Sequence, residues 1–236
     1  MQPFTVFIPV FNEEEIFSEN LSRLLTYLDS LQVPYEVLIG SNGSTDRTVE
    51  LGESVQRQHP QVTFFHLTRR GTGLAFREGV KRARYDHIIF VEMDLSVELD
   101  FIKKAVSLLE DFDMVVGVKE VSEQIRPTIR KLGGYLFHSC ASRILKLPFA
   151  DYSPAAKAFR KPRIVSYLDE LPAGSAFATY LIAFAFYDGA RGVQIPVRCR
   201  DLRKSKINLA QLGLQMYGHL FWLWFLTKKR RGKVSC

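Results

Sequence analysis

Residues 4–14 read FTVFIPVFNEE, and they join an apolar strand to the acidic start of a helix. The predicted strand covers Phe4–Val10 and stops where proline and asparagine break the apolar run. Behind it, residues 13–31 carry apolar side chains at helical spacing, with acids in the first turn. A strand followed directly by an amphipathic helix is half of a βαβ unit, which builds a parallel sheet.

The same alternation of short apolar runs and amphipathic stretches continues through the first hundred residues. Further strands are predicted at Tyr35–Ile39, Val62–Leu67 and His87–Val91, and further helices at Asp46–Gln58 and Gly73–Arg84. The last of these strands is nearly all apolar, as expected of one buried on both faces. We therefore predict an α/β fold with a mostly parallel sheet flanked by helices.

The second half of the chain is less regular. It contains predicted strands at Asp113–Val118, Ala155–Phe159 and Val193–Val197, and predicted helices at Pro127–Leu145, Ala173–Tyr187 and Asn208–Leu226. No linker rich in proline, glycine or serine separates the two halves. We expect a single domain over residues 1–210 and, over residues 208–236, an amphipathic aromatic helix with a basic tail.

The composition narrows the function classes. Of the 236 residues, 47% are hydrophobic and 24% charged, which excludes disordered and fibrous chains. A net charge of +7 suits nucleic acid, phosphorylated ligands or an anionic membrane, without choosing among them. The three cysteines lie far apart and no secretory leader is visible, so we expect a cytoplasmic protein without a disulfide framework or zinc knuckle.

Ligands of parallel sheets bind beyond the carboxyl ends of the strands. Four polar segments fall there, at residues 9–13, 41–46, 69–73 and 92–96. In the last segment, Glu92 and Asp94 would point the same way on an extended chain. Such a pair predicts a site for Mg²⁺ or Mn²⁺, although a solvated acidic turn is the simpler reading of the motif alone. The neighbouring ligand-facing segments favour the metal site.

A second cluster is basic. It comprises Arg198, Arg200, Arg203, Lys204 and Lys206, and Arg130 and Lys157 would join it if the chain folds back over the sheet. Guanidinium groups match phosphate oxygens, while a solvated basic loop is the alternative. Nucleic acid is disfavoured as a partner, because we find no helix-turn-helix or RRM signature and no aromatic residues interleaved on an exposed strand.

Several motifs in order along the chain together resemble glycosyltransferase family 2, with its GT-A fold. They are FIPVFNEE at residues 7–14, SNGSTD at 41–46, GTG at 71–73 and EMDLS at 92–96. Looser marks at residues 151–161 and at Ile195–Val197, followed by Arg200 and Lys206, are similar to the branch of dolichyl-phosphate mannose and glucose synthases. The resemblance covers roughly residues 4–210.

The resemblance implies an inverting, metal-dependent transfer of a hexose from a UDP- or GDP-sugar to a polyprenyl phosphate. The alternatives are a transferase with a glycan or other acceptor, and a non-catalytic relative that binds a nucleotide sugar. The processive Q-x-x-R-W motif is absent from the sequence, so repeated chain elongation is not expected.

The resemblance also assigns roles position by position. The residues implied to bind the nucleotide sugar are Pro9, Phe11, Glu13, Ser41, Glu92 and Asp94, and the last two would also hold the metal. The residues implied to be catalytic are Asp94, Arg130, Asp151 and Arg200. Those implied to bind the acceptor or a phosphate are Arg130, Lys157, Arg200 and Lys206.

This sequence shows five departures from the family pattern at ligand-facing sites, one of them over two residues. Ser41 stands where the family usually has an acid near the base, and Glu92 replaces the first Asp of D-x-D. The other departures are Thr72 for a lysine, Pro154 with Ala155 for Ser-Gly, and Arg203 for a glycine.

The C-terminal helix carries features of a membrane-surface anchor. Tyr217, Trp222 and Trp224 lie close in sequence to the basic run at residues 228–231. Packing into the core is the alternative, and neither late apolar helix reaches the roughly 20 residues that a membrane span needs. We expect peripheral association with the cytoplasmic face of a membrane; the oligomeric state stays open.

Overall fold

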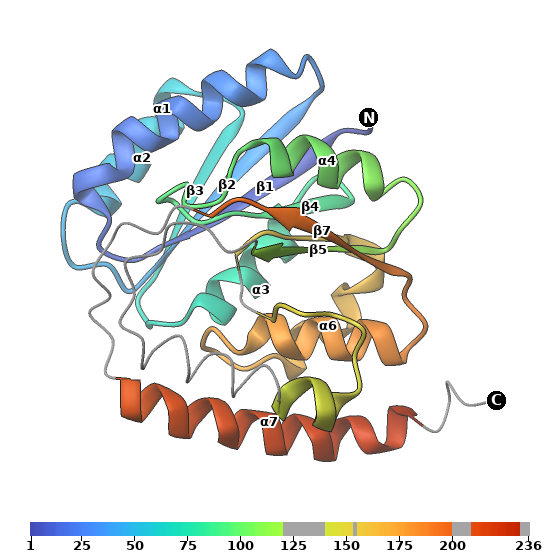
Figure 1. Cartoon of the computed structure of the whole chain (residues 1–236). Coiled ribbons are helices and arrows are strands. Elements are labelled where there is room, and N and C mark those ends of the chain that lie inside the picture. The colour runs from blue at the N-terminus through green and yellow to red at the C-terminus, as the bar shows by residue number, and fades with distance from the viewer. Residues whose placement is uncertain (120–139, 153–154, 200–208, 232–236) are drawn as a thin grey trace.

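The computed structural model describes residues 1–119, 140–152, 155–199 and 209–231 (Figure 1). Within these ranges one sheet of seven strands runs in the order β3-β2-β1-β4-β6-β5-β7. The strands are β1 (Phe4–Val10), β2 (Tyr35–Asn42), β3 (Val62–Leu67), β4 (His87–Phe90), β5 (Met114–Lys119), β6 (Lys157–Arg160) and β7 (Gly192–Val197). The helices are α1 (Glu14–Ser30), α2 (Thr48–Gln58), α3 (Thr72–Arg82), α4 (Asp100–Leu108), α6 (Phe177–Tyr187) and α7 (Leu209–Arg231), with 3₁₀ turns η1 (Lys161–Arg163) and η2 (Val165–Glu170).

The sheet is mostly parallel, as the sequence predicts. Strands β3, β2, β1 and β4 all run the same way, so their carboxyl ends meet at one edge. The exception is β6, which lies antiparallel between β4 and β5. Because β6 comes late in the chain and pairs with two earlier strands, its direction is set by long-range pairing rather than by any local pattern.

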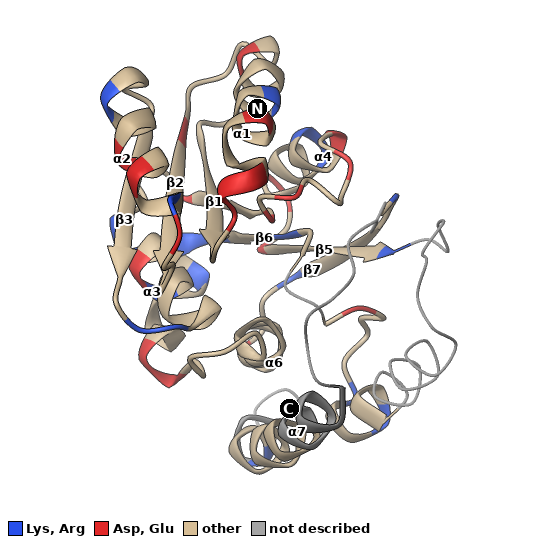
Figure 2. Cartoon of the chain, turned by 90° about the vertical axis from the view of Figure 1, so that its left-hand side faces the viewer, with Lys and Arg blue, Asp and Glu red and all other residues tan. Residues whose placement is uncertain are grey.

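Helices cover both faces of the sheet. Helices α1, α2 and α4 pack on one face, and α3 and α6 on the other. Helix α6 is apolar all round and almost completely buried, because it lies between the sheet and α7 (Figure 2). An aromatic cluster joins α3 and α6 to the sheet, and within it the rings of Phe76 and Phe177 stack with their centroids 4.7 Å apart.

Several predicted boundaries are wrong. The strand predicted to end at Ile39 instead continues to Asn42, because β2 pairs with β3 over these residues. Helix α4 was not predicted, since its nine residues hold only a short apolar pattern. Of the predicted helix at 127–145, only residues 140–145 lie in the described part, and these are helical.

The two late helices also differ from the prediction. Helix α6 begins at Phe177 rather than Ala173, because the preceding residues contact the start of α3 instead: the Ala173 carbonyl accepts a hydrogen bond of 2.7 Å from the Gly73 amide. A Cβ on Gly73 would lie 2.1 Å from the carbonyl oxygen of Pro172, so only glycine fits this contact. Helix α7 continues through the basic run at residues 228–231 instead of ending at Leu226.

Candidate active site

The loops that follow β1, β2 and β3 are joined by one buried side chain, Asn42, at the end of β2. Its amide nitrogen donates to the carbonyl of Val10, the last residue of β1, over 2.8 Å. Its amide oxygen accepts from the backbone of Gly71, in the turn before α3, over 3.1 Å. Asn42 was not among the predicted site residues, because nothing local in the sequence shows that a polar residue at the end of one strand bridges two other loops.

Asn12 fastens the loop after β1 to the loop after β2. Its backbone has φ of 53°, a left-handed conformation that asparagine tolerates. Its side-chain oxygen accepts from the Thr45 backbone amide over 2.8 Å, and its backbone amide donates to Ser44 Oγ over 3.2 Å. The segments predicted to face the ligand, residues 9–13 and 41–46, are therefore held together at one edge of the sheet.

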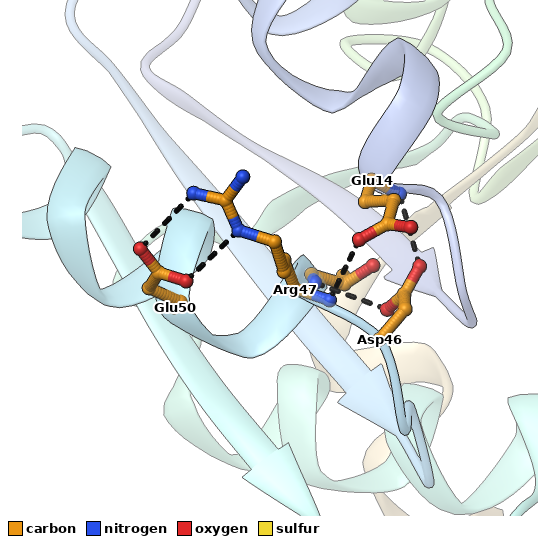
Figure 3. Close-up of polar contacts among 5 residues, drawn as sticks. Glu14, Asp46, Arg47 and Glu50 are labelled. Atoms are coloured by element: carbon orange, nitrogen blue, oxygen red, sulfur yellow. Dashed lines mark hydrogen bonds and ion pairs between the residues drawn. The ribbon is translucent and has the colours of Figure 1, made fainter.

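Asp46 ties the first turns of two helices together (Figure 3). One carboxylate oxygen accepts from the Glu14 amide of α1 over 3.2 Å, and the other accepts from the Thr48 amide of α2 over 3.0 Å. In return, the Glu14 carboxylate accepts from the Arg47 amide over 2.9 Å. Burial alone would raise the pKa of Asp46, but hydrogen bonds from Thr48 and Glu14 outweigh it and lower the pKa below its ordinary value.

The predicted metal ligands lie where β4 ends, but not on extended chain. The amide of Leu95 donates to the Glu92 carbonyl over 3.0 Å, and Leu95 has φ of 48°, so residues 92–95 form a turn. The expectation that Glu92 and Asp94 align through strand alternation is therefore wrong. Met93 is buried between them and its carbonyl accepts from Asn20 of α1 over 3.1 Å, which fixes the turn to the helix.

Both acidic side chains of this turn are half-buried, and Asp94 accepts a hydrogen bond of 3.0 Å from the Ser96 amide. Across the described ranges, no three His, Cys, Asp or Glu side chains gather as a ready-made metal site. A pair of carboxylates is nevertheless the protein share of many Mg²⁺ sites, where substrate phosphates and water complete the coordination. Glu92 and Asp94 thus fit a metal ion that a diphosphate shares.

Lys157 lies beside these acids, but inside the protein. It sits on β6 opposite Phe90 of β4, is 1% exposed, and donates to the carbonyls of Ala155 over 2.9 Å and Gly117 over 3.3 Å. Burial lowers its pKa to about 8, against the attraction of the Asp151 and Glu92 carboxylates. The ammonium group of Lys157 thus already has two acceptors within the protein. Its contact with a phosphate stays a prediction.

Some of the other predicted site residues lie in the described part of the chain and some do not. The carboxyl edge of β1 and β2 holds Pro9, Phe11, Glu13 and Ser41, and Glu92 and Asp94 follow the neighbouring strand β4. Asp151 is buried near Lys157. The ring of Phe11 carries the Arg70 guanidinium 4.0 Å from its centroid. Arg130, Arg200 and Lys206 lie outside the described residues, as do Pro154 and Arg203.

His66 is a second residue to which the sequence analysis gave no role. It pairs with Ser41 across β2 and β3, and its Nδ1 lies 3.0 Å from Ser41 Oγ. The prediction of a strand at Val62–Leu67 is confirmed, but only the register of the two strands shows which residue faces Ser41.

The mostly parallel sheet and the helices on its two faces have the α/β architecture of the GT-A fold. The family model described as "Glycosyl transferase family 2" matches residues 5–167, and the chain belongs to that family. Residues 5–167 are thus a glycosyltransferase family 2 domain.

Two curated relatives are similar over most of this chain. The undecaprenyl-phosphate 4-deoxy-4-formamido-L-arabinose transferase of Edwardsiella ictaluri is 28% identical over 92% of this chain and 66% of its own length. An uncharacterized glycosyltransferase of Synechocystis is 25% identical over 78% of this chain and 58% of its own length. The chain thus spans less than two thirds of the length of either relative.

Solved structures share the fold. Glucosyl-3-phosphoglycerate synthase of Mycobacterium tuberculosis, in complex with Mn²⁺, UDP-glucose and phosphoglyceric acid, superposes with a TM-score of 0.70 at 16% identity, covering 94% of this chain and 80% of that one. S. aureus TarS in complex with UDP-GlcNAc gives a TM-score of 0.62 at 17% identity, covering 94% and 66%. At these identities the likeness concerns the fold alone.

The two-helix contact of Asp46 predicts a pH-dependent loss of stability on substitution. Asp46→Asn keeps one acceptor oxygen for two amides, so we expect the free energy of unfolding at pH 7 to fall by about 1 kcal/mol. Since the folded-state pKa of Asp46 is lowered, its contribution is present above the unfolded pKa and is lost as the pH falls through the folded value. Urea unfolding of wild type and variant at several pH values between about 7 and 3 measures this, the difference shrinking over the acid end.

The matched control is Glu50→Gln, which removes only an exposed ion pair with Arg47 and should leave stability nearly unchanged. A loss for Asp46→Asn that stays constant down to the lowest pH would contradict the assignment.

Proposed function

We propose that the protein transfers a hexose from a UDP- or GDP-sugar to a polyprenyl phosphate, with inversion at the anomeric carbon and with the help of Mg²⁺ or Mn²⁺. The observation that carries the proposal is the pair Glu92 and Asp94 at the carboxyl end of β4, close to the segments after β1 and β2. The acceptor class follows the name of the Edwardsiella relative, which acts on undecaprenyl phosphate.

The chemistry proposed for the donor depends on charge rather than on a strong base. When bound, the metal ion would neutralise charge on the departing nucleoside diphosphate. Glu92 and Asp94 would hold that ion, and the turn at residues 92–95, pinned by Asn20, would keep their positions fixed. Phe11 would offer its ring to the base, beneath the guanidinium of Arg70.

The acceptor phosphate is itself the nucleophile in this proposal. An oxygen of the already ionised phosphate attacks the anomeric carbon as the bond from that carbon to the diphosphate breaks, so no side chain needs to remove a proton. Arg130, Arg200 and Lys206 are proposed to bind the acceptor or donor phosphates, as the family resemblance implies. Asp151, buried near Lys157, stays a proposed acceptor-side residue.

We further propose that α7 lies on the membrane surface that holds the acceptor. Its inner side chains Leu220 and Leu223 are buried against α6, and Tyr180 of α6 donates to the His219 carbonyl over 3.1 Å. Its outer side chains include Tyr217, Phe221, Trp222 and Phe225, which are 44%, 67%, 55% and 58% exposed. The buried side of α7 agrees with the expectation of core packing, and the exposed aromatic side supports the proposal of membrane attachment.

A surface row of aromatic residues beside cations suits the boundary between headgroups and acyl chains. The ammonium of Lys228 lies 5.7 Å from the Trp224 ring, so charge and aromatic surface are contiguous. None of the helices in the described ranges is long and apolar enough to cross a bilayer. We propose peripheral attachment at the cytoplasmic face.

Substitution of Asp94 tests the catalytic proposal. Asp94→Asn removes one charge from the proposed metal site, and we expect the rate of hexose transfer to fall about 100-fold or more. The assay follows labelled hexose from UDP-glucose or GDP-mannose to polyprenyl phosphate in vesicles with Mn²⁺. The matched control is Asp111→Asn, an exposed carboxylate in the loop before β5, which should keep the wild-type rate.

Wild-type transfer that survives Asp94→Asn would overturn the metal assignment. Wild-type protein that binds a nucleotide sugar but transfers to no acceptor would instead support the non-catalytic alternative.

The membrane proposal has its own test. The double variant Trp222→Ser/Phe225→Ser removes two exposed rings whose centroids lie 5.9 Å apart. We expect wild type to bind vesicles of phosphatidylglycerol and phosphatidylcholine, and most of the double variant to stay unbound. The measurement is co-sedimentation, with Val165→Ser as control because Val165 is an equally exposed apolar residue on η2. Unchanged sedimentation of the double variant would end the proposal for α7.

A further inference from the structure

Ser41 and His66 form a polar pair where a base would be recognised. They are register partners on β2 and β3, at the carboxyl edge of the sheet. Ser41 is fully buried whereas His66 is exposed, so the imidazole is the end of the pair that a ligand can reach.

The hydrogen bonds behind His66 favour one tautomer of its ring. In this arrangement the Ser41 hydroxyl donates to Ser44 Oγ over 3.0 Å, and Ser44 Oγ also accepts from the Asn12 backbone amide. A hydroxyl has one hydrogen to donate, so Ser41 Oγ is left as an acceptor toward His66 Nδ1, 3.0 Å away. In the neutral ring Nδ1 then carries the hydrogen, and Nε2 carries a lone pair.

The same chain of hydrogen bonds ends beside the surface on which a base would stack. Asn12 directly follows Phe11, whose ring lies under the Arg70 guanidinium. Aromatic rings and guanidinium planes both stack well on nucleobases. A base at Phe11 would therefore have His66, on the second strand over, within the same edge of the sheet.

We infer that His66 is a specificity-determining residue, whose Nε2 accepts a hydrogen bond from a ring N–H of the donor's base. This inference rests on the proposed function. Uracil and guanine carry such a ring N–H on their pairing edge, whereas cytosine and adenine carry a lone pair there. With cytosine or adenine, the lone pair of the base would face the lone pair of His66 Nε2, so the hydrogen bond would be lost and an acceptor left unsatisfied. His66 therefore selects for uracil or guanine.

The test compares nucleotides that differ at this one edge. Calorimetric titration of the full chain with UDP, CDP and 3-methyl-UDP, each with Mn²⁺, measures the three affinities. We expect wild type to bind UDP about tenfold more tightly than either of the others, as one hydrogen bond to a neutral group allows. If GDP is the nucleotide bound, the comparison is GDP with ADP and the same ratio is expected.

Substitution then assigns the preference to the residue. In His66→Ala the affinity for UDP should fall about tenfold while that for CDP stays unchanged, so the preference disappears. His66→Phe keeps a ring without the acceptor and should behave alike, which guards against a fold defect in the first variant. Thr63→Ala, an exposed change on the same strand, should keep the wild-type preference.

The outcomes separate this inference from the proposed function. A preference for UDP or GDP that survives both His66 substitutions overturns the inference alone, as does a wild type that prefers CDP or ADP. Wild-type protein that binds none of these nucleotides overturns the proposed function, and the inference with it.

Discussion

The site depends on the buried side chain of Asn42, whose amide spans the space between the end of β1 and the turn before α3. Three loops that could otherwise move separately are thereby fixed to the last residue of β2. The amide is 4% exposed, so its loss would leave a backbone carbonyl and a backbone amide unsatisfied in a dry environment. The positions of Phe11, Ser41 and the start of α3 all follow from this one bridge.

The helices on the two faces of the sheet have different structural roles. On the face covered by α1 and α4, the contact of Asn20 with Met93 links the helix to the acidic turn, so packing on that face positions Glu92 and Asp94. On the other face, α6 is almost completely buried between the sheet and α7, so it acts as a spacer that keeps α7 away from the sheet. Under the proposed function, the same fold offers a charged edge to the donor and the exposed aromatic side of α7 to a lipid surface.

Local sequence patterns predicted the strands well, because the apolar runs of β1 and β3 follow a proline or a polar residue and reach a polar residue within two positions of their ends. They failed where the outcome depends on distant partners. The length of β2 follows from pairing with β3, and the delayed start of α6 follows from the contact of Ala173 with Gly73. Helix α7 continues through Lys228 because lysine and arginine are good helix formers, which their charge alone does not reveal.

The place of the candidate site could be predicted from the sequence because the ends of the strands could be predicted. Polar segments after β1, β2 and β4 meet at one edge because parallel strands end together. The turn at Glu92, the burial of Lys157 and the pairing of Ser41 with His66 required the three-dimensional structure, since each depends on a neighbour from another part of the chain.

The central claim is that this edge binds the diphosphate of a nucleotide sugar through a metal ion held by Glu92 and Asp94. Thermal unfolding of the full chain with UDP-, GDP- and CDP-linked sugars, each with and without Mn²⁺, tests it most directly. The account predicts that the unfolding temperature rises with a UDP- or GDP-sugar and that the rise requires the metal. No rise with any donor, or an equal rise without metal, would contradict it.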